Sequence, residues 1–458
     1  MLSFPSWMRG RSGARAAVGT TRERSGGGSR RDGDTRSVQE RNLSSLLFVA
    51  ATNNTAWNLI TPFIPLFILE LVDGDPIQAA AWSGIALGIS PLMTALAGPF
   101  WGNFAARYGA RRAMMRTLLT SPVLVVLLAF CTAIWQLLLL RFLIGVAGGF
   151  YVLVHALVAQ TAARDRVGHA IGSLQAISML SLAIVPPIAG LFTDIWGVRS
   201  NFFLGAAIML ASFAVMWRGY QSETPTAADG AGGTSSPGTA ESRVPKERAV
   251  SYWSLIRSPE LALIAAIVFV GQYVERTFWP LAPLLVVEMA PGSEQIGSMT
   301  GFLLGIGSGA TALSALVVGR LTRRVSVRSL LIASLAFGCV TLPLVAVMDS
   351  FWTFVGVRVV MGLLTGGVVT LAYAYVSTIL PADRLSVSFS MFASVAMVAS
   401  AVGPVSMSTL ATTAGLRSPL IVGAIGFGCC LVLLLLAGRR SETSRAVPQQ
   451  AERSEGGA

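Results

Sequence analysis

The sequence has very few charged residues for its length. Only 12% of its 458 residues are charged, whereas about 25% are charged in a typical soluble domain. Hydrophobic residues make up 53% of the chain, and the mean hydropathy is +0.66. So few charges cannot cover the surface of a soluble protein of this length. The sequence therefore predicts an integral membrane protein with lipid as its main solvent.

Residues that bind metals or form disulfides are also scarce. The four cysteines all lie inside apolar runs, and the two histidines are isolated from one another. No metal-ligand spacing, extracellular disulfide framework or nucleophile–base constellation is present. We therefore expect no metal, no cofactor and no enzymatic activity.

The formal net charge of +12 does not indicate nucleic-acid binding. The basic residues form short clusters between apolar runs and in the N-terminal tail, and not the single continuous basic face that nucleic acid requires. The expected surroundings of the chain are instead a lipid bilayer.

The apolar runs are long enough to be membrane-spanning helices, each of which needs about 20 mainly apolar residues. The sequence predicts an all-α membrane protein with twelve spans, at residues 43–71, 79–101, 113–134, 136–160, 169–192, 200–217, 261–288, 297–318, 328–348, 351–379, 385–411 and 418–437.

Arginine placement predicts the orientation of these spans. Three alternate links carry Arg107, Arg111 and Arg112; Arg164 and Arg166; and Arg320, Arg323, Arg324 and Arg328. The opposite links carry mainly acids. Because basic links face the cytoplasm, we expect both termini to be cytoplasmic and the protein to lie in the plasma (inner) membrane.

The polar segments predict the domain boundaries. Residues 1–42 are rich in arginine, serine and glycine and are expected to form a disordered cytoplasmic tail. Residues 43–218 and 259–438 are the two predicted six-helix bundles. The intervening segment 219–258 is predicted to be a cytoplasmic linker, and residues 439–458 a second disordered tail.

The two bundles repeat each other. Arg141, Gly145 and Gly149 correspond to Arg358, Gly362 and Gly366 at a constant separation of 217 positions, and so do Arg107 and Arg324, and Pro187 and Pro404. Duplication of a six-span unit explains this pattern. A substrate site between parallel six-span halves is a known plan for transporters.

Several motifs resemble those of a known family. Residues 102–112 (GNFAARYGARR) resemble the signature between spans two and three of the major facilitator superfamily, and residues 137–145 (LLLLRFLIG) resemble its arginine motif in span four. Residues 185–190 (VPPIAG) resemble its antiporter motif. Residues 62–67 and 99–102 resemble more narrowly its bacterial twelve-span multidrug/proton antiporter branch. The resemblance covers residues 43–437 and implies the major facilitator fold.

The resemblance also implies a cytoplasmic gate, formed here by Gly102, Arg107, Gly109, Arg111 and Arg112. The family signature has an acid where Ala106 stands, and this acid latches the cytoplasmic side by facing a helix N-terminus. The corresponding position of the second half is Arg323. We therefore expect the latch to be weaker here, or to be built from other residues.

Ionisable residues inside spans are the main candidates for function, because a charge at the bilayer centre costs about 2.5–3.5 kcal/mol. They are Arg141 and His155 in span four, Glu275 and Arg276 in span seven, and Arg358 in span ten. Glu275 either forms a structural pair with an arginine or binds protons or a cationic substrate. His155 is either a packed residue or a second proton carrier, since histidine titrates near neutral pH.

Polar and aromatic residues concentrate in the spans that line the cavity in this superfamily. Asn54, Trp57 and Asn58 lie in span one, Gln272 in span seven and Tyr373 in span ten. Such residues can simply join helices through hydrogen bonds. Their concentration in these spans favours an aqueous pathway.

Together these features predict a proton-coupled exporter of small amphipathic organic compounds, working by alternating access. We expect it to be a monomer that binds a small-molecule substrate and protons. Two alternatives stay open. One is a uniporter or symporter for a sugar or organic anion, which Arg141, Arg276 and Arg358 would suit. The other is a membrane sensor or assembly protein on a transporter fold, which would carry no substrate.

Overall fold

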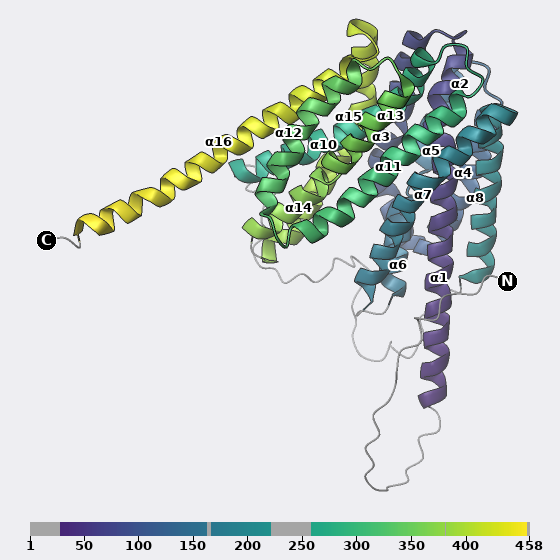
Figure 1. The fold of residues 1–458 in the computed structure, drawn as a ribbon. Coiled ribbons are helices and arrows are strands. Elements are labelled where there is room, and N and C mark those ends of the chain that lie inside the picture. Colours follow the sequence, from purple (N-terminus) through teal and green to yellow (C-terminus); the bar gives the residue numbers. More distant parts are fainter. Residues whose placement is uncertain (1–27, 163–165, 221–257, 381, 456–458) are drawn as a thin grey trace, which may run out of the picture.

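The computed structural model describes residues 28–162, 166–220, 258–380 and 382–455, and in these ranges the chain is helical and carries no strand (Figure 1). The longer elements are α1 Gly28–Ile60, α3 Pro76–Tyr108, α4 Ala110–Ala129, α7 Val167–Trp196, α8 Arg199–Gly219, α10 Pro259–Met289, α11 Ile296–Leu321, α12 Val327–Ala346, α15 Ala382–Ala414 and α16 Ser418–Glu455. The shorter ones are η2 Thr61–Phe63, α2 Ile64–Leu71, α5 Ile134–Ala147, α6 Phe150–Thr161, α13 Phe351–Thr365 and α14 Val368–Ile379.

The twelve predicted spans are all present. Ten helical segments of the described chain are long and apolar enough to cross a membrane, with Phe351–Ile379 counted as one of them. The other two are the first span, formed by α1, η2 and α2, and the fourth, formed by α5 and α6. The predicted all-helical fold of two six-helix repeats is therefore confirmed.

Three spans are broken, and each break follows from its residues. Pro62 lies in the 3₁₀ turn η2, where its ring prevents continuation of the α-helix. Gly149 joins α5 to α6 with a φ of +112°, a left-handed conformation that favours glycine. In span ten the break lies at Gly366 and Gly367, so it recurs at the equivalent position of the second repeat.

The described helices extend beyond the predicted tail boundaries. Helix α1 begins at Gly28 and α16 ends at Glu455, so both helices continue past the predicted bundle boundaries at residues 43 and 438. Helix propagation explains this difference, because extending a formed helix costs far less than starting one. Residues 1–27, 456–458 and most of the predicted linker, 221–257, lie outside the described residues.

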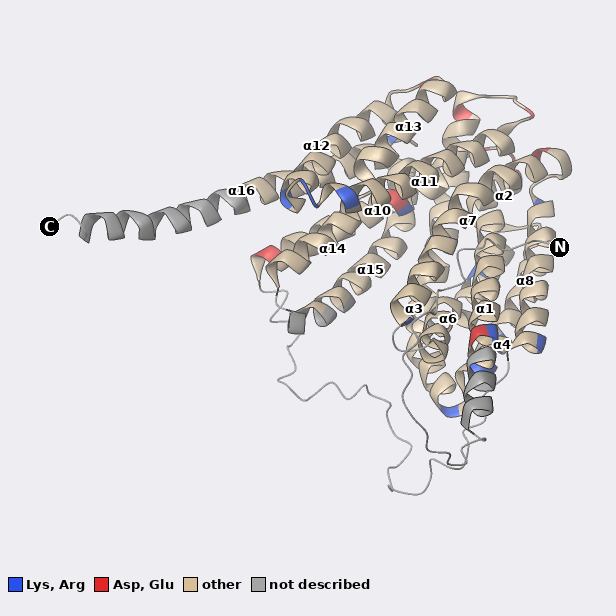
Figure 2. Ribbon diagram, turned by 60° about the horizontal axis from the view of Figure 1, so that its bottom comes forward, with Lys and Arg blue, Asp and Glu red and all other residues tan. Residues whose placement is uncertain are grey.

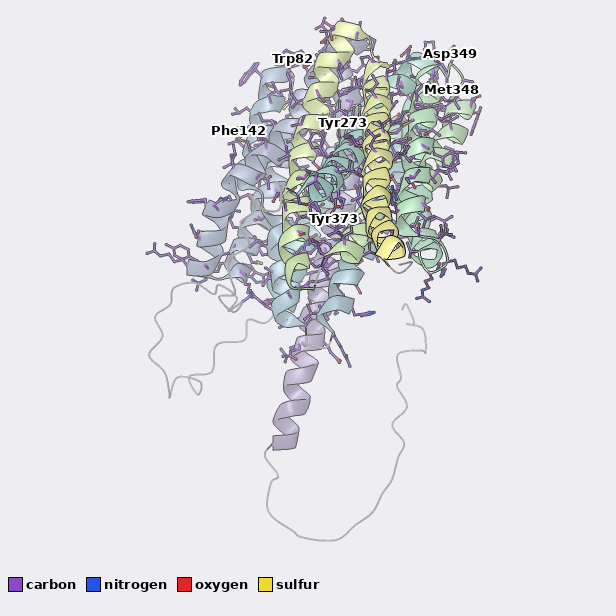
Figure 3. The ribbon with its side chains drawn as sticks, turned by 90° about the vertical axis from the view of Figure 1, so that its left-hand side faces the viewer. Trp82, Phe142, Tyr273, Met348, Asp349 and Tyr373 are labelled. Atoms are coloured by element: carbon purple, nitrogen blue, oxygen red, sulfur yellow. The ribbon has the colours of Figure 1, made fainter. Side chains whose placement is uncertain are left out.

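Charged residues lie mostly near the helix ends, as Figure 2 shows, and apolar side chains such as Phe142 face outward between them (Figure 3). Such a wide apolar surface fits contact with lipid. We call one end of the bundle, with Asp75, Glu294 and Asp349, the acidic end. The other, with Arg112 and Arg323, is the basic end.

The two halves pack together mainly through two helix pairs, α7 with α11 and α3 with α15, and α10 also contacts α2 and α3. Glycines permit this close approach. A Cβ added to Gly301 would overlap the backbone of Pro186, and one added to Gly84 would overlap the backbone of Pro404. These contacts lie in the parts of the helices nearer the acidic end. From there the halves diverge toward the basic end, at the bottom of Figure 1.

One carboxylate adds a polar contact between the halves at the acidic end. Asp194, near the end of α7, accepts hydrogen bonds from the backbone N–H groups of Gly297 (2.7 Å) and Ser298 (2.8 Å) in the first turn of α11. A helix N-terminus carries unpaired N–H groups and partial positive charge, so a carboxylate stabilises it. We call this contact the acidic-end latch.

Candidate functional site

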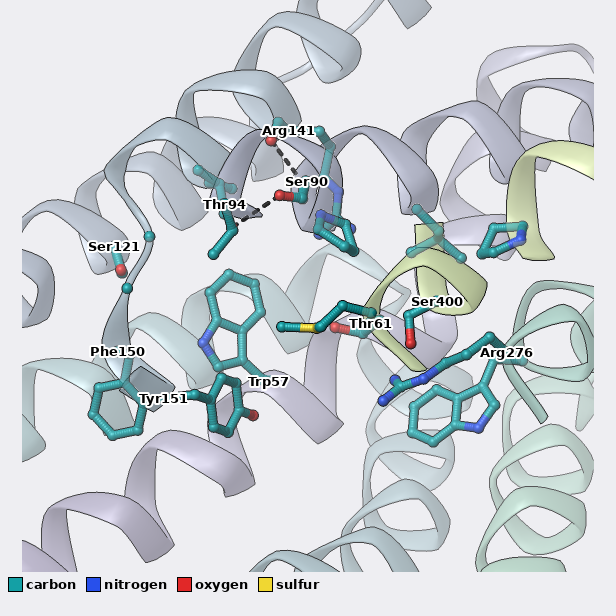
Figure 4. A pocket seen from close by; sticks show the side chains of 18 of the residues that line it. Trp57, Thr61, Ser90, Thr94, Ser121, Arg141, Phe150, Tyr151, Arg276 and Ser400 are labelled. Atoms are coloured by element: carbon teal, nitrogen blue, oxygen red, sulfur yellow. Dashed lines mark hydrogen bonds between the residues drawn. The ribbon is translucent and has the colours of Figure 1, made fainter. Parts of the chain in front are cut away.

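A cavity of about 340 Å³ lies where the two halves meet; we call it the central cavity. Its volume is within the range of small-molecule sites. The lining residues come from α1, η2, α3, α4, α5, α6, α10 and α15, so both halves contribute. Figure 4 shows part of this lining, with Trp57, Phe150 and Tyr151 on one side and Arg276 and Ser400 on the other.

Arg141 enters the central cavity from α5. Its side chain is only 4% exposed, and its Nε donates to the carbonyl oxygen of Ala86 (2.9 Å). The backbone beside it is held by α3, since Ser90 Oγ donates to the Arg141 carbonyl (2.6 Å) and Thr94 Oγ1 to that of Gly145 (3.1 Å). Two hydroxyls one helical turn apart thus fix α5 against α3 and aim the guanidinium.

Arg276 approaches the central cavity from the other half, on α10. It is exposed and lies one turn before Trp279 and Pro280, which also line the cavity. Ser400 and Met397 of α15 complete this side. The two arginines therefore reach one cavity from different halves of the molecule (Figure 4).

An aromatic wall closes the cavity on the α6 side. The left-handed turn at Gly149 is followed directly by Phe150 and Tyr151, which both line the cavity. The Tyr151 hydroxyl donates to Asn54 Oδ1 (3.1 Å), so Asn54 contributes by orienting this ring. Trp57 lies beside Tyr151 in Figure 4.

Glu275 and Arg358 form a pair outside the cavity lining. Arg358 Nη2 lies 3.4 Å from Glu275 Oε1, and the two side chains are 2% and 33% exposed. The guanidinium also lies over the Phe278 ring, 4.5 Å from its centroid. The acid predicted to be functional is thus already bound to a buried cation.

Three other candidates do not line the central cavity. His155 Nδ1 lies 2.7 Å from the Tyr151 carbonyl oxygen, one turn back in α6. Tyr373 packs edge-on against Phe389 and Phe392. Gln272 lies one turn before Arg276 on α10, half-buried. Of the predicted pathway residues, Trp57, Asn58, Arg141 and Arg276 line the cavity.

The predicted gate residues lie at the basic end and within one half. Gly109 ends α3 with a φ of +93°, which favours glycine. Arg111 donates to the Trp217 carbonyl of α8 (3.4 Å), while Arg107 and Arg112 are exposed. A Cβ added to Gly102 would meet no atom within 4 Å. The motif therefore makes no close packing contact at Gly102 in this conformation.

Sequence reasoning missed several residues. Ser90, Thr94 and Tyr151 line the cavity, and the i, i+4 spacing of the two hydroxyls was the available signal. It also missed Arg116, which donates to the Ala147 carbonyl at the break in span four (3.0 Å). Its guanidinium lies 3.2 Å from the centroid of the Trp101 ring. Nothing local to position 116 indicates these partners.

Comparison with known proteins places the fold. The family model described as Major Facilitator Superfamily matches residues 46–308 and 265–455. The multidrug resistance protein MdtG of Escherichia fergusonii is 26% identical over 414 residues, covering 90% of this chain and 96% of that protein. MdtG of Proteus mirabilis is 27% identical, covering 70% and 77%.

Solved structures agree on the fold. A bacterial homologue of the human lysosomal transporter Spinster, in an inward-facing and unoccupied conformation, superimposes with a TM-score of 0.67 at 13% identity, covering 88% of this chain and 97% of that one. The nucleoside transporter NupG gives a TM-score of 0.67 at 12% identity, covering 86% and 99%. The chain therefore belongs to the Major Facilitator Superfamily, and it is an integral membrane transporter and not an enzyme.

Proposed function

We propose that the protein exports small amphipathic organic compounds in exchange for protons, by alternating access. The observation that carries this proposal is the central cavity, which has aromatic, hydroxyl and guanidinium groups on one surface and lies between two halves. The similarity to MdtG proteins, which are multidrug resistance proteins, supports efflux.

In this proposal the basic end faces the cytoplasm, because basic links stay on that side of a membrane. Both termini are then cytoplasmic, and the protein is a monomer of the inner membrane. The halves are joined at the acidic end by the acidic-end latch and diverge at the basic end. The described conformation thus accepts substrate from the cytoplasm, and rocking of the halves exposes it on the other side.

Proton exchange is assigned to Glu275. Its side chain is 33% exposed and that of its partner Arg358 only 2%, so the acid is the accessible member of the pair. Protonation removes the attraction between them and leaves Arg358 with the Phe278 ring. Helix α10 also carries Arg276 and Trp279, which line the cavity. A movement of α10 that follows protonation of Glu275 therefore moves part of the cavity lining.

Flux in proteoliposomes, measured with and without a pH gradient, tests this function. The variant Glu275→Gln mimics the protonated acid, and we expect it to lose gradient-driven accumulation while keeping substrate exchange. The control Glu288→Gln removes an acid that pairs with Arg417 at the acidic end (3.1 Å) and should retain both. Uphill transport by Glu275→Gln at the normal rate would contradict the assignment, and His155 would become the leading proton carrier.

A second function, uptake of an organic anion by uniport or symport, is favoured by the arginines in the cavity. The direction of transport under an imposed pH gradient separates it from efflux. Absence of flux for every compound tested would instead favour the sensor or assembly protein.

A further inference from the structure

The charged groups that line the central cavity all have one sign. Arg141 and Arg276 line it, and none of its described lining residues is acidic. The acid next to Arg276 in sequence, Glu275, is paired with Arg358 and lies outside the lining. The cavity therefore offers two cations to a ligand and no side-chain anion.

Neither guanidinium has all of its N–H donors hydrogen-bonded to the described residues. Among the described residues, Arg141 makes one side-chain hydrogen bond, from Nε to the Ala86 carbonyl, and takes part in no salt bridge. Arg276 makes neither a hydrogen bond nor a salt bridge in the same part of the chain. Several N–H donors are thus free to bind a ligand.

A buried arginine without an acid is costly, and two in one cavity repel each other. An anion between them relieves both effects. Carboxylate, sulfonate and phosphonate groups match the planar fork of guanidinium donors and accept two parallel hydrogen bonds. An organic cation would be repelled by the same pair.

The remaining surface suits an apolar body attached to that anion. Trp57, Phe150, Tyr151 and Trp279 supply flat aromatic faces, and Leu87, Ile144 and Met397 supply aliphatic contact. Ser90, Thr94 and Ser400 add neutral hydroxyls. A volume of about 340 Å³ accommodates a small aromatic or aliphatic acid.

We infer that the central cavity selects amphipathic organic anions, with Arg141 and Arg276 binding the anionic group from opposite halves. This inference rests on the proposed transport function and names its substrate class. The two-sided contact also links binding to movement, because an anion held by both arginines draws α5 and α10 together. Cations and neutral compounds lack this link.

Three probes of one shape test the charge preference: naphthoate, naphthamide and naphthylmethylammonium, titrated calorimetrically into the full-length protein in lipid nanodiscs at neutral pH. We expect naphthoate to bind about tenfold more tightly than either of the others, the difference that one charge-assisted hydrogen bond supplies. Failure of naphthoate to bind, or equal or tighter binding of the ammonium compound, would overturn the inference.

Variants test the arginines. Arg276→Gln, at an exposed position, should weaken naphthoate binding about tenfold and leave naphthamide within about twofold. Arg141→Gln should have the same effect. Arg276→Lys keeps the positive charge and should weaken naphthoate binding less than Arg276→Gln does. Arg320→Gln removes an exposed charge at the basic end and is the control for net charge. Unchanged naphthoate affinity in Arg276→Gln would refute its role even if Arg141→Gln fails to fold.

Flux measurements separate this inference from the proposed function. If the cation or the amide is transported under a pH gradient and naphthoate is not, the substrate class is wrong while transport stands. If naphthoate binds with the expected selectivity and none of the probes is transported, the selectivity is right and the transport function is wrong.

Discussion

Arg141 and Arg358 occupy equivalent positions of the two repeats, yet their surroundings differ. Both are nearly fully buried, at 4% and 1% exposure. Arg358 lies beside the carboxylate of Glu275 and over the Phe278 ring, whereas Arg141 has one backbone carbonyl and faces the central cavity.

The difference originates in the first helix of each half. Pro62 and Pro280 align these helices at a separation of 218, so the residue equivalent to Glu275 is Trp57. Its neighbour Asn58 donates its Nδ2 to Ser181 Oγ (3.1 Å), so neither position holds an acid. The second half therefore contains both members of an ion pair, and the first contains only the cation. The same residue type, at the same position of a duplicated unit, pairs with an acid in one half and is a candidate ligand-binding group in the other.

The largest expected effect breaks the pair in the second half. Arg358→Met leaves Glu275 without its cation. Loss of one member of a buried pair costs about 3–5 kcal/mol, and the 33% exposure of Glu275 puts the expected loss at the lower end of that range. Arg141→Met leaves no acid without a partner, so it should lower the free energy of unfolding less than Arg358→Met does. Unfolding monitored by circular dichroism in detergent compares the two, and the double variant Glu275→Gln/Arg358→Met should recover part of the loss. Equal destabilisation by both single variants would mean that the halves do not differ in this way.

The next change gives the first half the missing acid. Asn58→Glu places a carboxylate in the cavity that Arg141 lines, and it should lower naphthoate affinity about tenfold by occupying guanidinium donors. Asn58→Gln is the uncharged control, and calorimetry is the measurement. Similar affinities in the Glu and Gln variants would show that an acid at this position does not reach the arginine.

The acidic-end latch is also asymmetric, because the first half supplies the acid and the second half supplies the helix N-terminus. Asp194→Asn should weaken it by about 1 kcal/mol, roughly a fivefold shift in population. Electron–electron distances between spin labels at Ile77 and Glu294, in a cysteine-free background, should lengthen.

Asp75→Asn is the matched control for the latch. Asp75 is also at the acidic end, but it caps its own helix α3, where hydrogen bonds from the backbone N–H groups of Gln78 and Ile77 lower the pKa of its carboxyl. Its loss should leave the distance between halves unchanged. An unchanged distribution in Asp194→Asn as well would rule out the latch.

The smallest expected effect restores the family acid at the basic end. A carboxylate facing a helix N-terminus is worth about 0.3–1 kcal/mol, so Ala106→Asp should modestly increase the population with the basic end closed. Labels at Arg112 and Arg323 report this distance, and Ala106→Asn is the control. If Asp and Asn variants give the same distances, the loop has lost its latch function.

Much of the architecture was predictable because it depends on local pattern. Twenty-residue apolar runs located the spans, and the positions of Pro62 and Gly149 coincide with breaks. Asp75 followed by proline, and Ser258 followed by proline, begin α3 and α10 by capping the first turn. Each of these signals is read within a few residues.

For the site, the sequence predicted which residues are unusual but not which of them contact one another. The sequence identified Arg141, Arg276, Glu275 and Arg358 as unusual, because charges inside apolar runs are costly wherever they lie. It left the partner of Glu275 open between several arginines, and the structure selects Arg358. It marked Ala106 as a missing acid without indicating that Asp194 joins the halves at the other end.

The sequence by itself determined the membrane environment, the spans, the duplication and the kinds of polar group that the spans contain, since hydropathy and helix capping act between near neighbours along the chain. Only the tertiary structure decided which arginine is paired and which faces the cavity. That choice depends on how α1, α5, α10 and α13 are rotated and packed against one another, and helix rotation is set by side-chain contacts between segments far apart in the chain.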